Sequence, residues 1–288
     1  MTLPVLYAEG ENRKMEVKKL TELEEYLKKL KKVAVAYSGG VDSSFLLFVA
    51  RKCLGGENTL AVTVVSSLTP PWDLEFAKSF TRKIGVELKL IEGEKKISQA
   101  SFSENSPMRC YYCRQFNYRI IKEHIPEEFT LVSGTNASDE GDFRPGMKAE
   151  QELGIKTPLR DLGITKDQIR HISRMLGIPG WDRPSSACLA SPIPFGVPIN
   201  LQELKLVEKA ELFFRKMGFD FIRVRIFPYK TAKIEVKIED LHRIFQEREK
   251  ILKKLKDLGF KNITVDLEGY VPAGLKFLEV EDGSLHKT

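Results

Sequence analysis

The segment SGGVDSS, residues 38–44, has the residue types of a phosphate-binding loop. Its two adjacent glycines let the backbone adopt positive φ and approach an anion closely. The residues that follow open a helix, whose free N–H groups and dipole favour phosphate. The serine hydroxyls can donate to phosphate oxygens, whereas Asp42 has no proton to donate and would act beside phosphate through Mg²⁺. The spacing predicts a phosphate site formed by Ser38, Gly39, Gly40, Asp42, Ser43 and Ser44.

Two other kinds of nucleotide loop are disfavoured by what this segment lacks. It has neither the lysine of a Walker A loop nor the G-x-G-x-x-G pattern of a dinucleotide site, which argues against a GTPase and a dehydrogenase. The alternative that stays open is a plain strand–turn–helix, in which Asp42 and Ser43 only begin the helix.

Three of the four cysteines form a second candidate site. Cys110 and Cys113 stand at Cys-x-x-Cys spacing beside arginines, which favour thiolates, and Cys188 is the third. A redox or persulfide pair, a zinc site, an iron–sulfur cluster held by three cysteines and three unrelated thiols all stay open. Structural zinc needs four ligands, and no histidine stands at ligand spacing from these cysteines. Cys53 lies in the apolar segment FLLFVARKCL and is expected to be a core thiol.

Polar residues also follow or occupy predicted strands. Gly134 and Thr135 follow an apolar run, at the sheet edge where open α/β folds bind ligands; a strand-end turn is the alternative. Arg223 and Arg225 occupy alternate positions of a strand and therefore share one face. Two guanidinium groups on one face suit a substrate phosphate, with a solvated strand face as the alternative. Arg144 could clamp a carboxylate or a phosphate through two N–H groups.

These residues must be positioned by the surrounding strands and helices. The order of those elements predicts an α/β fold with a doubly wound parallel sheet in the first part of the chain. Apolar runs of strand type alternate with segments that carry leucine and other apolar residues at helical spacing. The predicted strands are 33–37, 59–65, 86–91 and 129–136, and the predicted helices include 16–30, 45–54 and 73–84.

The pattern changes after about residue 195, which predicts a domain of 1–195 and a smaller α+β domain of 196–288. Apolar and polar residues alternate strictly in two segments, FIRVRIF and AKIEVKI, which predicts two antiparallel strands joined in a hairpin. We expect helices at 201–218 and 239–259, the second closed by Gly259, and a last strand in NITVDLEGY.

Composition fits a soluble globular protein. The chain has 288 residues, 42% hydrophobic and 30% charged, with a net charge of +6 that is spread along its length. This diffuse charge argues against a nucleic-acid partner, and no apolar stretch approaches the ~20 residues that a membrane helix needs. The N-terminal residues lack a signal-peptide layout, so we expect a cytoplasmic protein.

The motif SGGVDSS after the strand VAVAY resembles the signature of the PP-loop ATP pyrophosphatases. This resemblance implies an adenine nucleotide alpha hydrolase-like fold that cleaves ATP between its α and β phosphates. The loop would grip the pyrophosphate leaving group while an acceptor oxygen attacks the α-phosphate. Fixed N–H donors suit this reaction because the leaving group gains charge in the transition state.

From residue 15 to the C-terminus, the segments GDFRPG and WDRPSSACLAS in particular, the chain resembles the LarE family. LarE proteins are ATP-dependent sulfur transferases that act on pyridinium-3,5-biscarboxylic acid mononucleotide to make the nickel-pincer nucleotide. The resemblance implies nucleotide contacts for Gly134 and Thr135 and phosphate contacts for Arg223 and Arg225. It also implies that Glu211 lines the substrate or metal-binding region, as does Glu235. Pro192 replaces the arginine that is usual in the family, which leaves the exact substrate open.

In one branch of this family a single cysteine, matching Cys188, gives up its own sulfur and is spent. In another branch three cysteines, matching Cys110, Cys113 and Cys188, resemble the ligands of a [4Fe-4S] cluster whose open iron carries sulfide. The sequence has all three, so the resemblance implies the cluster branch. Cys188 and Asp42 are then the predicted catalytic residues, and ATP, Mg²⁺ and the cluster the predicted cofactors.

Two other functions compete with this reading. One is a PP-loop thiolase or amidotransferase on another substrate, such as tRNA; the other is a non-catalytic cluster or nucleotide sensor that binds ATP without releasing pyrophosphate. The expected partners are a small nucleotide substrate and either sulfide or a sulfur-donor protein. We expect a homo-oligomer based on dimers, with a hexamer as one option.

Overall fold

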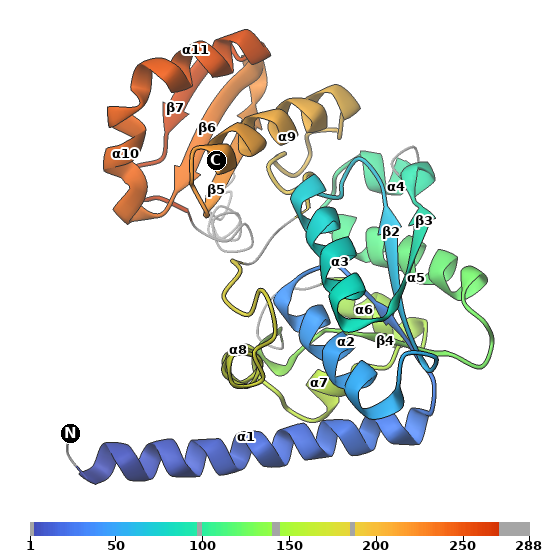
Figure 1. Ribbon diagram of the computed structural model, residues 1–288. Helices are drawn as coiled ribbons and strands as arrows, with labels where there is room; N and C mark the ends of the chain where they lie inside the picture. Colours follow the sequence, from blue (N-terminus) through green and yellow to red (C-terminus); the bar gives the residue numbers. More distant parts are fainter. Residues whose placement is uncertain (1–2, 97–99, 140–144, 185–187, 271–288) are drawn as a thin grey trace, which may run out of the picture. The chain divides into compact units, whose positions relative to one another are not determined.

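The computed structural model describes residues 3–96, 100–139, 145–184 and 188–270 (Figure 1). Their contacts divide the chain into two compact units, each of which is described by itself. The first unit takes its residues from 1–66, 71–96 and 110–186, and the second from 67–70, 97–109 and 187–288. The domain boundary predicted at residue 195 stays a prediction.

The first unit alternates strands and helices in the order expected for an α/β fold. Its main elements are α1 (Leu3–Leu30), β1 (Val33–Ala36), α2 (Val41–Leu54), β2 (Thr59–Val65), α3 (Pro71–Ile84), β3 (Glu87–Glu92), α5 (Arg109–His124), β4 (Thr130–Ser133), α6 (Pro145–Glu152), α7 (Pro158–Asp161) and α8 (Lys166–Met175). The strands form one sheet in the order β3-β2-β1-β4, and every pair is parallel. The predicted parallel α/β sheet is therefore confirmed.

Two hydrophobic cores cover the two faces of this sheet, as a doubly wound fold requires. Successive side chains of a strand point to opposite faces, so Val33 and Val35 lie in one core and Ala34 lies in the other. The first core is completed by side chains from α1, α2, α3, α7 and α8, and the second by Tyr118 and Ile121 of α5. The continuous apolar runs of β1 and β2 follow from burial on both faces.

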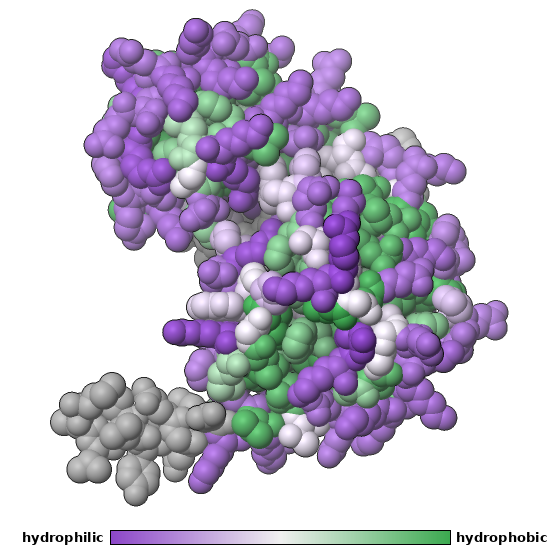
Figure 2. All heavy atoms as spheres, in the orientation of Figure 1, coloured by the Kyte–Doolittle hydropathy of each residue, from purple (hydrophilic) through white to green (hydrophobic). Residues whose placement is uncertain are grey.

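The second unit is a three-stranded sheet with helices. Its elements are α4 (Ala100–Ser103), α9 (Leu201–Lys216), β5 (Ile222–Phe227), β6 (Thr231–Val236), α10 (Leu241–Gln246), α11 (Arg248–Leu258) and β7 (Asn262–Val265). The expected hairpin of β5 and β6 is present, and α9 buries Leu204, Val207 and Phe214 on its apolar stripe. Figure 2 shows mostly hydrophilic side chains over α10 and α11, which fits their many charged residues.

Two details of the second unit differ from the sequence-based expectation. The last strand, β7, pairs parallel to β6, because α10 and α11 carry the chain back across the sheet before β7 begins. The segment 239–259 forms two helices that meet at Glu247 instead of one, and neither glycine nor proline marks the break. Gly259 ends α11 in the left-handed region at φ 106°, as its position predicts.

Across the described ranges, none of the helices combines the length and the apolar character that crossing a bilayer requires.

Candidate functional site

The loop between β1 and α2 has the backbone of an anion site. Gly39 adopts φ 75°, which an L side chain rarely tolerates, and Gly40 is the N-cap of α2 in an extended conformation. Glycine has no side chain to bond the first N–H groups of the helix, so the helix start carries no side-chain cap. Such a start, with its dipole, attracts phosphate.

The serines of this loop have separate tasks. Ser43 donates to the Gly40 carbonyl at 3.1 Å and lies 3.1 Å from the Ser38 hydroxyl, so it holds the loop in shape. Ser44 is buried and meets the Tyr37 hydroxyl at 3.1 Å. Burial raises the pKa of Tyr37, which keeps this hydroxyl protonated. Ser38 and Ser43 therefore hold the turn before α2 in shape, whereas Ser44 bonds Tyr37 inside the protein.

Two side chains that the motif did not reveal approach the loop. Lys166, at the first position of α8, places its Nζ 3.9 Å from Asp42 Oδ2. This helix starts at a capping box in which Thr165 and Gln168 bond each other's backbone N–H groups, so the position of Lys166 is well defined. Arg183 donates to the carbonyl of Gly39 at 2.7 Å. Both lie more than a hundred residues after the loop, which is why no local spacing could reveal them.

Gly134 packs directly on the start of α2. A Cβ at this position would lie 2.9 Å from the backbone nitrogen of Ser43 and 3.0 Å from its Cα, closer than real Cβ contacts. The end of β4 and the phosphate loop are therefore in contact through backbone, at the carboxyl edge of the parallel sheet. Any side chain at Gly134 would push the helix start away.

Thr135 faces a buried carboxylate instead of open solvent. Glu150 of α6 is fully buried, and its Oε1 accepts hydrogen bonds from Thr135 at 2.6 Å and from Arg114 Nη1 at 2.7 Å. Tyr118 at 2.9 Å and Ser133 at 2.8 Å complete the set of donors. Burial alone would lower the pKa of Arg114, but nearby Tyr118 and Glu150 raise it, so the guanidinium is charged. Glu150 thus ties the end of β4 to α5.

Helix α5 carries the Cys-x-x-Cys pair one turn apart. Cys110 is exposed and Cys113 is half-buried, and neither forms a disulfide bond. Cys188, also exposed and free, belongs to the second unit. Two accessible thiols on one helix suit two ligands of a cluster. Within the described residues, however, no group of three or more His, Cys, Asp or Glu side chains is placed to hold a metal ion. The [4Fe-4S] cluster is therefore not shown by the described residues.

A buried polar network in the second unit joins the chain segments that flank the cysteines. Arg109, which precedes Cys110, donates to the carbonyl of Ala190 at 3.0 Å and to Asn105 Oδ1 at the length of a short hydrogen bond. Asn105 in turn donates to the carbonyls of Pro194 at 2.7 Å and Val197 at 2.8 Å. Ala190 stands two residues after Cys188, so this network fixes the backbone on the C-terminal side of that cysteine.

The two arginines of β5 are buried against carboxylates. Arg223 Nη1 donates to Glu211 Oε2 at 3.0 Å, and Arg225 Nε donates to Glu235 Oε1 at 2.7 Å. All four residues are at most 4% exposed. Lys233 lies 3.1 Å from Glu235 as well. The predicted arginines and the predicted carboxylates are thus brought together, as partners of one another.

Glu211 and Arg223 act on each other's pKa in this cluster. Burial raises the pKa of Glu211, and the charge of Arg223 opposes that rise only in part. The raised pKa of Arg223 follows from Glu211, which outweighs the opposite effect of burial. Arg223 Nε is buried and has no hydrogen-bond partner among the described residues, so one donor of this guanidinium is left for another acceptor.

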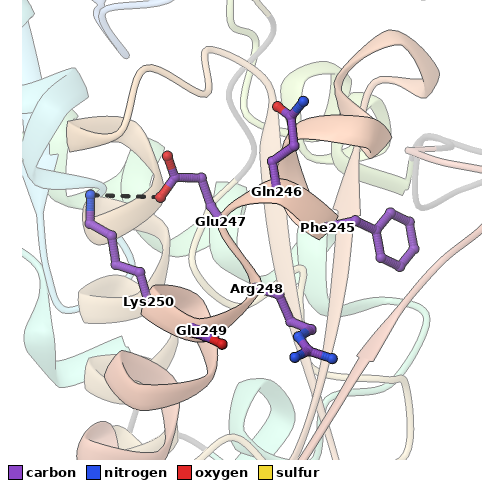
Figure 3. Close-up of a pocket in the computed structure, with 6 residues that line it drawn as sticks. All are labelled: Phe245, Gln246, Glu247, Arg248, Glu249 and Lys250. Atoms are coloured by element: carbon purple, nitrogen blue, oxygen red, sulfur yellow. Dashed lines mark ion pairs between the residues drawn. The ribbon is translucent and has the colours of Figure 1, made fainter.

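An open hollow of about 560 Å³ lies where α10 meets α11, and it is lined by six consecutive residues, 245–250 (Figure 3). The side chains spread in different directions, and the contact drawn among them is the Glu247–Lys250 ion pair at 4.0 Å. It contains none of the predicted site residues, so it is not the candidate active site. Arg144 and the segment 185–187 of WDRPSSACLAS lie outside the described residues.

A Gly-Gly loop after the first strand of a sheet ordered β3-β2-β1-β4 defines a PP-loop domain of the ATP pyrophosphatase class. In agreement, residues 16–120 match the NAD synthase family. The chain is similar to an uncharacterized protein of Synechocystis sp., 34% identical over 259 residues that cover 88% of this chain and 94% of the relative. It is 29% identical over 248 residues to the pyridinium-3,5-bisthiocarboxylic acid mononucleotide synthase of Lactiplantibacillus plantarum, covering 85% of this chain and 88% of the relative.

The similarities to the relatives run through both units. An uncharacterized protein of Methanocaldococcus jannaschii is 35% identical over 260 residues, with 88% of this chain and 98% of the relative covered. The chain belongs to the LarE family. This family is part of the PP-loop superfamily, so the chain is an ATP-utilising enzyme.

Proposed function

We propose that this enzyme is an ATP-dependent sulfur transferase that converts pyridinium-3,5-biscarboxylic acid mononucleotide to its thiocarboxylate forms, for the nickel-pincer nucleotide. The observation that carries the ATP chemistry is the uncapped start of α2 behind the Gly39–Gly40 turn, pressed against the end of β4 by Gly134. The Lactiplantibacillus plantarum relative, whose name states a bisthiocarboxylic acid product, supports the acceptor class.

The first step is adenylylation of a substrate carboxylate. A carboxylate oxygen bonds to the α-phosphorus of ATP, the bond from that phosphorus to the bridging oxygen breaks, and pyrophosphate leaves. Pyrophosphate gains charge in this step, and N–H groups fixed at the start of α2 would stabilise that charge. Asp42 is an oxygen ligand of the kind that Mg²⁺ takes, and the ion would supply charge neutralisation on the phosphates. Lys166, beside Asp42, adds a cation at the same edge.

The second step delivers sulfur to the activated carboxylate. Hydrosulfide attacks the acyl carbon, the acyl–oxygen bond to AMP breaks, and a thiocarboxylate, AMP and a proton result. No electron transfer is needed, so the step requires only a sulfide equivalent. The second carboxylate of the substrate would need another ATP and another sulfide.

We propose Cys110, Cys113 and Cys188 as the thiols that present the sulfide equivalent. None of the three forms a disulfide bond, two are exposed, and Cys110 and Cys113 share one helix. The network of Arg109 and Asn105, which fixes the backbone after Cys188 and is adjacent in sequence to Cys110, supports a common role. The [4Fe-4S] cluster on these cysteines stays a prediction, and no step is derived through it.

We further propose that Arg223 and Arg225 bind the phosphate of the substrate. The spare Nε of Arg223 supports this role, since a buried guanidinium N–H without an acceptor favours an anionic ligand. Glu211 and Glu235 would then hold the two arginines in place before the substrate arrives.

The adenylylation step is tested with acceptor whose carboxylates carry ¹⁸O. Mass spectrometry of the AMP should show one ¹⁸O atom per sulfur transferred, because the acyl–oxygen bond breaks and the oxygen stays on phosphorus. AMP without the label, formed alongside thiocarboxylate, would show that the carboxylate is not the nucleophile. ATP binding without any pyrophosphate release would instead support the sensor alternative.

The cysteine proposal is tested by replacing each cysteine with alanine and reconstituting the protein anaerobically with iron and sulfide. C110A, C113A and C188A should each lose the brown chromophore and sulfur transfer together, whereas the matched control C53A should keep both. Retention of a single turnover by C110A and C113A, with Cys188 losing about the mass of H₂S, would contradict the shared site and favour a sacrificial cysteine.

A further inference from the structure

Arg183 links the phosphate loop to a segment far along the chain. Its Nη1 donates to the carbonyl of Gly39 at 2.7 Å, and its Nη2 donates to Asp73 Oδ1 of α3 at 2.9 Å. The guanidinium lies 3.8 Å from the centre of the Phe76 ring, a stacking contact of cation–π type. One side chain thus holds the loop and α3 at the same time.

The local backbone leaves room for this arginine and little else. Gly180 adopts φ 77°, and a Cβ there would lie 2.6 Å from Phe76 and 2.8 Å from Arg183 Cδ. From the other side, Arg170 of α8 donates to the carbonyls of Trp181 and Arg183, both at 2.8 Å. The segment that carries Arg183 is therefore anchored by contacts that do not involve the phosphate loop.

The orientation of the Gly39 carbonyl decides where the next N–H points. In a planar trans peptide the carbonyl of Gly39 and the N–H of Gly40 point in opposite directions. Among the described residues, the Gly40 N–H donates to the Ser38 hydroxyl at 3.3 Å, which is a long contact. A peptide between two glycines has little steric resistance to rotation, and a half-turn would aim the carbonyl oxygen at the phosphates. Such an oxygen would repel an anionic ligand.

We propose that Arg183 is a positioning residue for the phosphate loop: it fixes the Gly39 carbonyl and thereby aims the Gly40 N–H and the start of α2 at the pyrophosphate part of ATP. The inference rests on the ATP site of the proposed function and on neither its acceptor nor its sulfur. Asp73 and Phe76 fix the direction of the guanidinium fork, so its geometry matters as well as its charge.

The test is calorimetric binding of Mg-ATP and of inorganic pyrophosphate to the full chain, with neither acceptor nor sulfide present. R183M should weaken both ligands by about tenfold or more. R183K should be equally weak, because one ammonium group cannot bridge the Gly39 carbonyl and Asp73 in the way the planar fork does. R170M is the matched control: it removes two hydrogen bonds to the same segment and should lower the melting temperature while ligand affinity stays within twofold.

Three results would overturn the proposal. Affinity of R183M within twofold of wild type would remove any role in binding. Retained affinity in R183K would mean that only the charge matters, as for a direct contact with phosphate. An equal loss of affinity in R170M would mean that R183M acts by disturbing the fold of this segment and not through the Gly39 carbonyl. Since R183K keeps a positive charge beside Asp73, it gives a folded protein if R183M does not. If the wild-type protein binds ATP but transfers no sulfur, the proposed function is wrong, whereas the binding test of Arg183 still applies.

Discussion

The phosphate loop and strand β5 are the two places where an anion is expected, and they differ in what provides the attraction. At the loop, the donors are backbone N–H groups at the start of α2, which no side chain caps. In β5, two arginines are buried against Glu211 and Glu235. An anion at the loop therefore meets backbone donors that no side chain caps, whereas a phosphate at β5 has to share its arginines with carboxylates. A backbone site offers its N–H donors to the ligand directly, whereas an arginine in a buried ion pair can bind an anion only through a donor that its carboxylate partner does not use.

The largest expected effect comes from the acidic residue of the loop. D42N should lower AMP and pyrophosphate formation at least about 10⁴-fold, or ~5.5 kcal/mol, because charge neutralisation by a metal ion is worth several kcal/mol. The fold should stay intact, since Asp42 lies in the first turn of α2 and is partly exposed. The control is D167N, which changes an exposed first-turn aspartate of α8. Normal turnover by D42N would break the comparison at the loop.

The second effect concerns the ion pair of β5. R223M should lower the free energy of unfolding in urea by about 3–5 kcal/mol, because it leaves Glu211 buried without its partner. The double variant E211M/R223M should regain most of that stability yet still show a raised KM for the mononucleotide. R225M should cost less than R223M, since Lys233 still pairs with Glu235 at 3.1 Å. A double variant as unstable as R223M would contradict the balanced-pair description.

The third effect tests the close approach of β4 to the loop. G134A should cost about 1–3 kcal/mol of stability, as overpacking does, and should weaken ATP binding, because the added methyl group displaces the start of α2. G154A is the matched control: nothing lies within 4 Å of its Cβ, but its φ is 62°, so it loses stability through backbone strain alone. Equal ATP affinity in both variants would show that the contact at Gly134 does not shape the site.

The smallest effect is expected at Cys53. Burial raises the pKa of this thiol, so it should stay protonated and resist iodoacetamide at neutral pH, while the exposed Cys110 and Cys188 react. C53A should cost about 1 kcal/mol or less and leave AMP formation unchanged. Peptide mass spectrometry of the alkylated protein measures the labelling directly. Alkylation of Cys53 as fast as that of Cys110 would show that it is no core thiol.

Local features were predictable from the sequence. The buried strands 33–37 and 59–65 read as continuous apolar runs, and the loop with its two glycines marked the strand-to-helix turn, because neighbouring residues determine both. Long-range partners were not predictable. Lys166 and Arg183 reach the loop only through folding, and an isolated lysine or arginine carries no local signal of its target.

Strand β5, which carries Arg223 and Arg225, shows the same limit of sequence-based prediction. Alternation placed Arg223 and Arg225 on one face, and the structure agrees. The pairing with Glu211 and Glu235 was missed, because one carboxylate comes from α9 and the other from β6, and the pattern of one strand does not encode its neighbours. The parallel pairing of β7 and the break at Glu247 were missed for a related reason: tertiary packing decides both.

The central claim, ATP cleavage between the α and β phosphates at the loop after β1, is tested most directly by identifying the products. Purified protein is given Mg-ATP, the biscarboxylate mononucleotide and sulfide, and the nucleotides and phosphates are separated and counted. The account predicts AMP and pyrophosphate in equal amounts, dependent on the acceptor and abolished in D42N. ADP with orthophosphate would contradict it, as would AMP and pyrophosphate formation that persists in D42N.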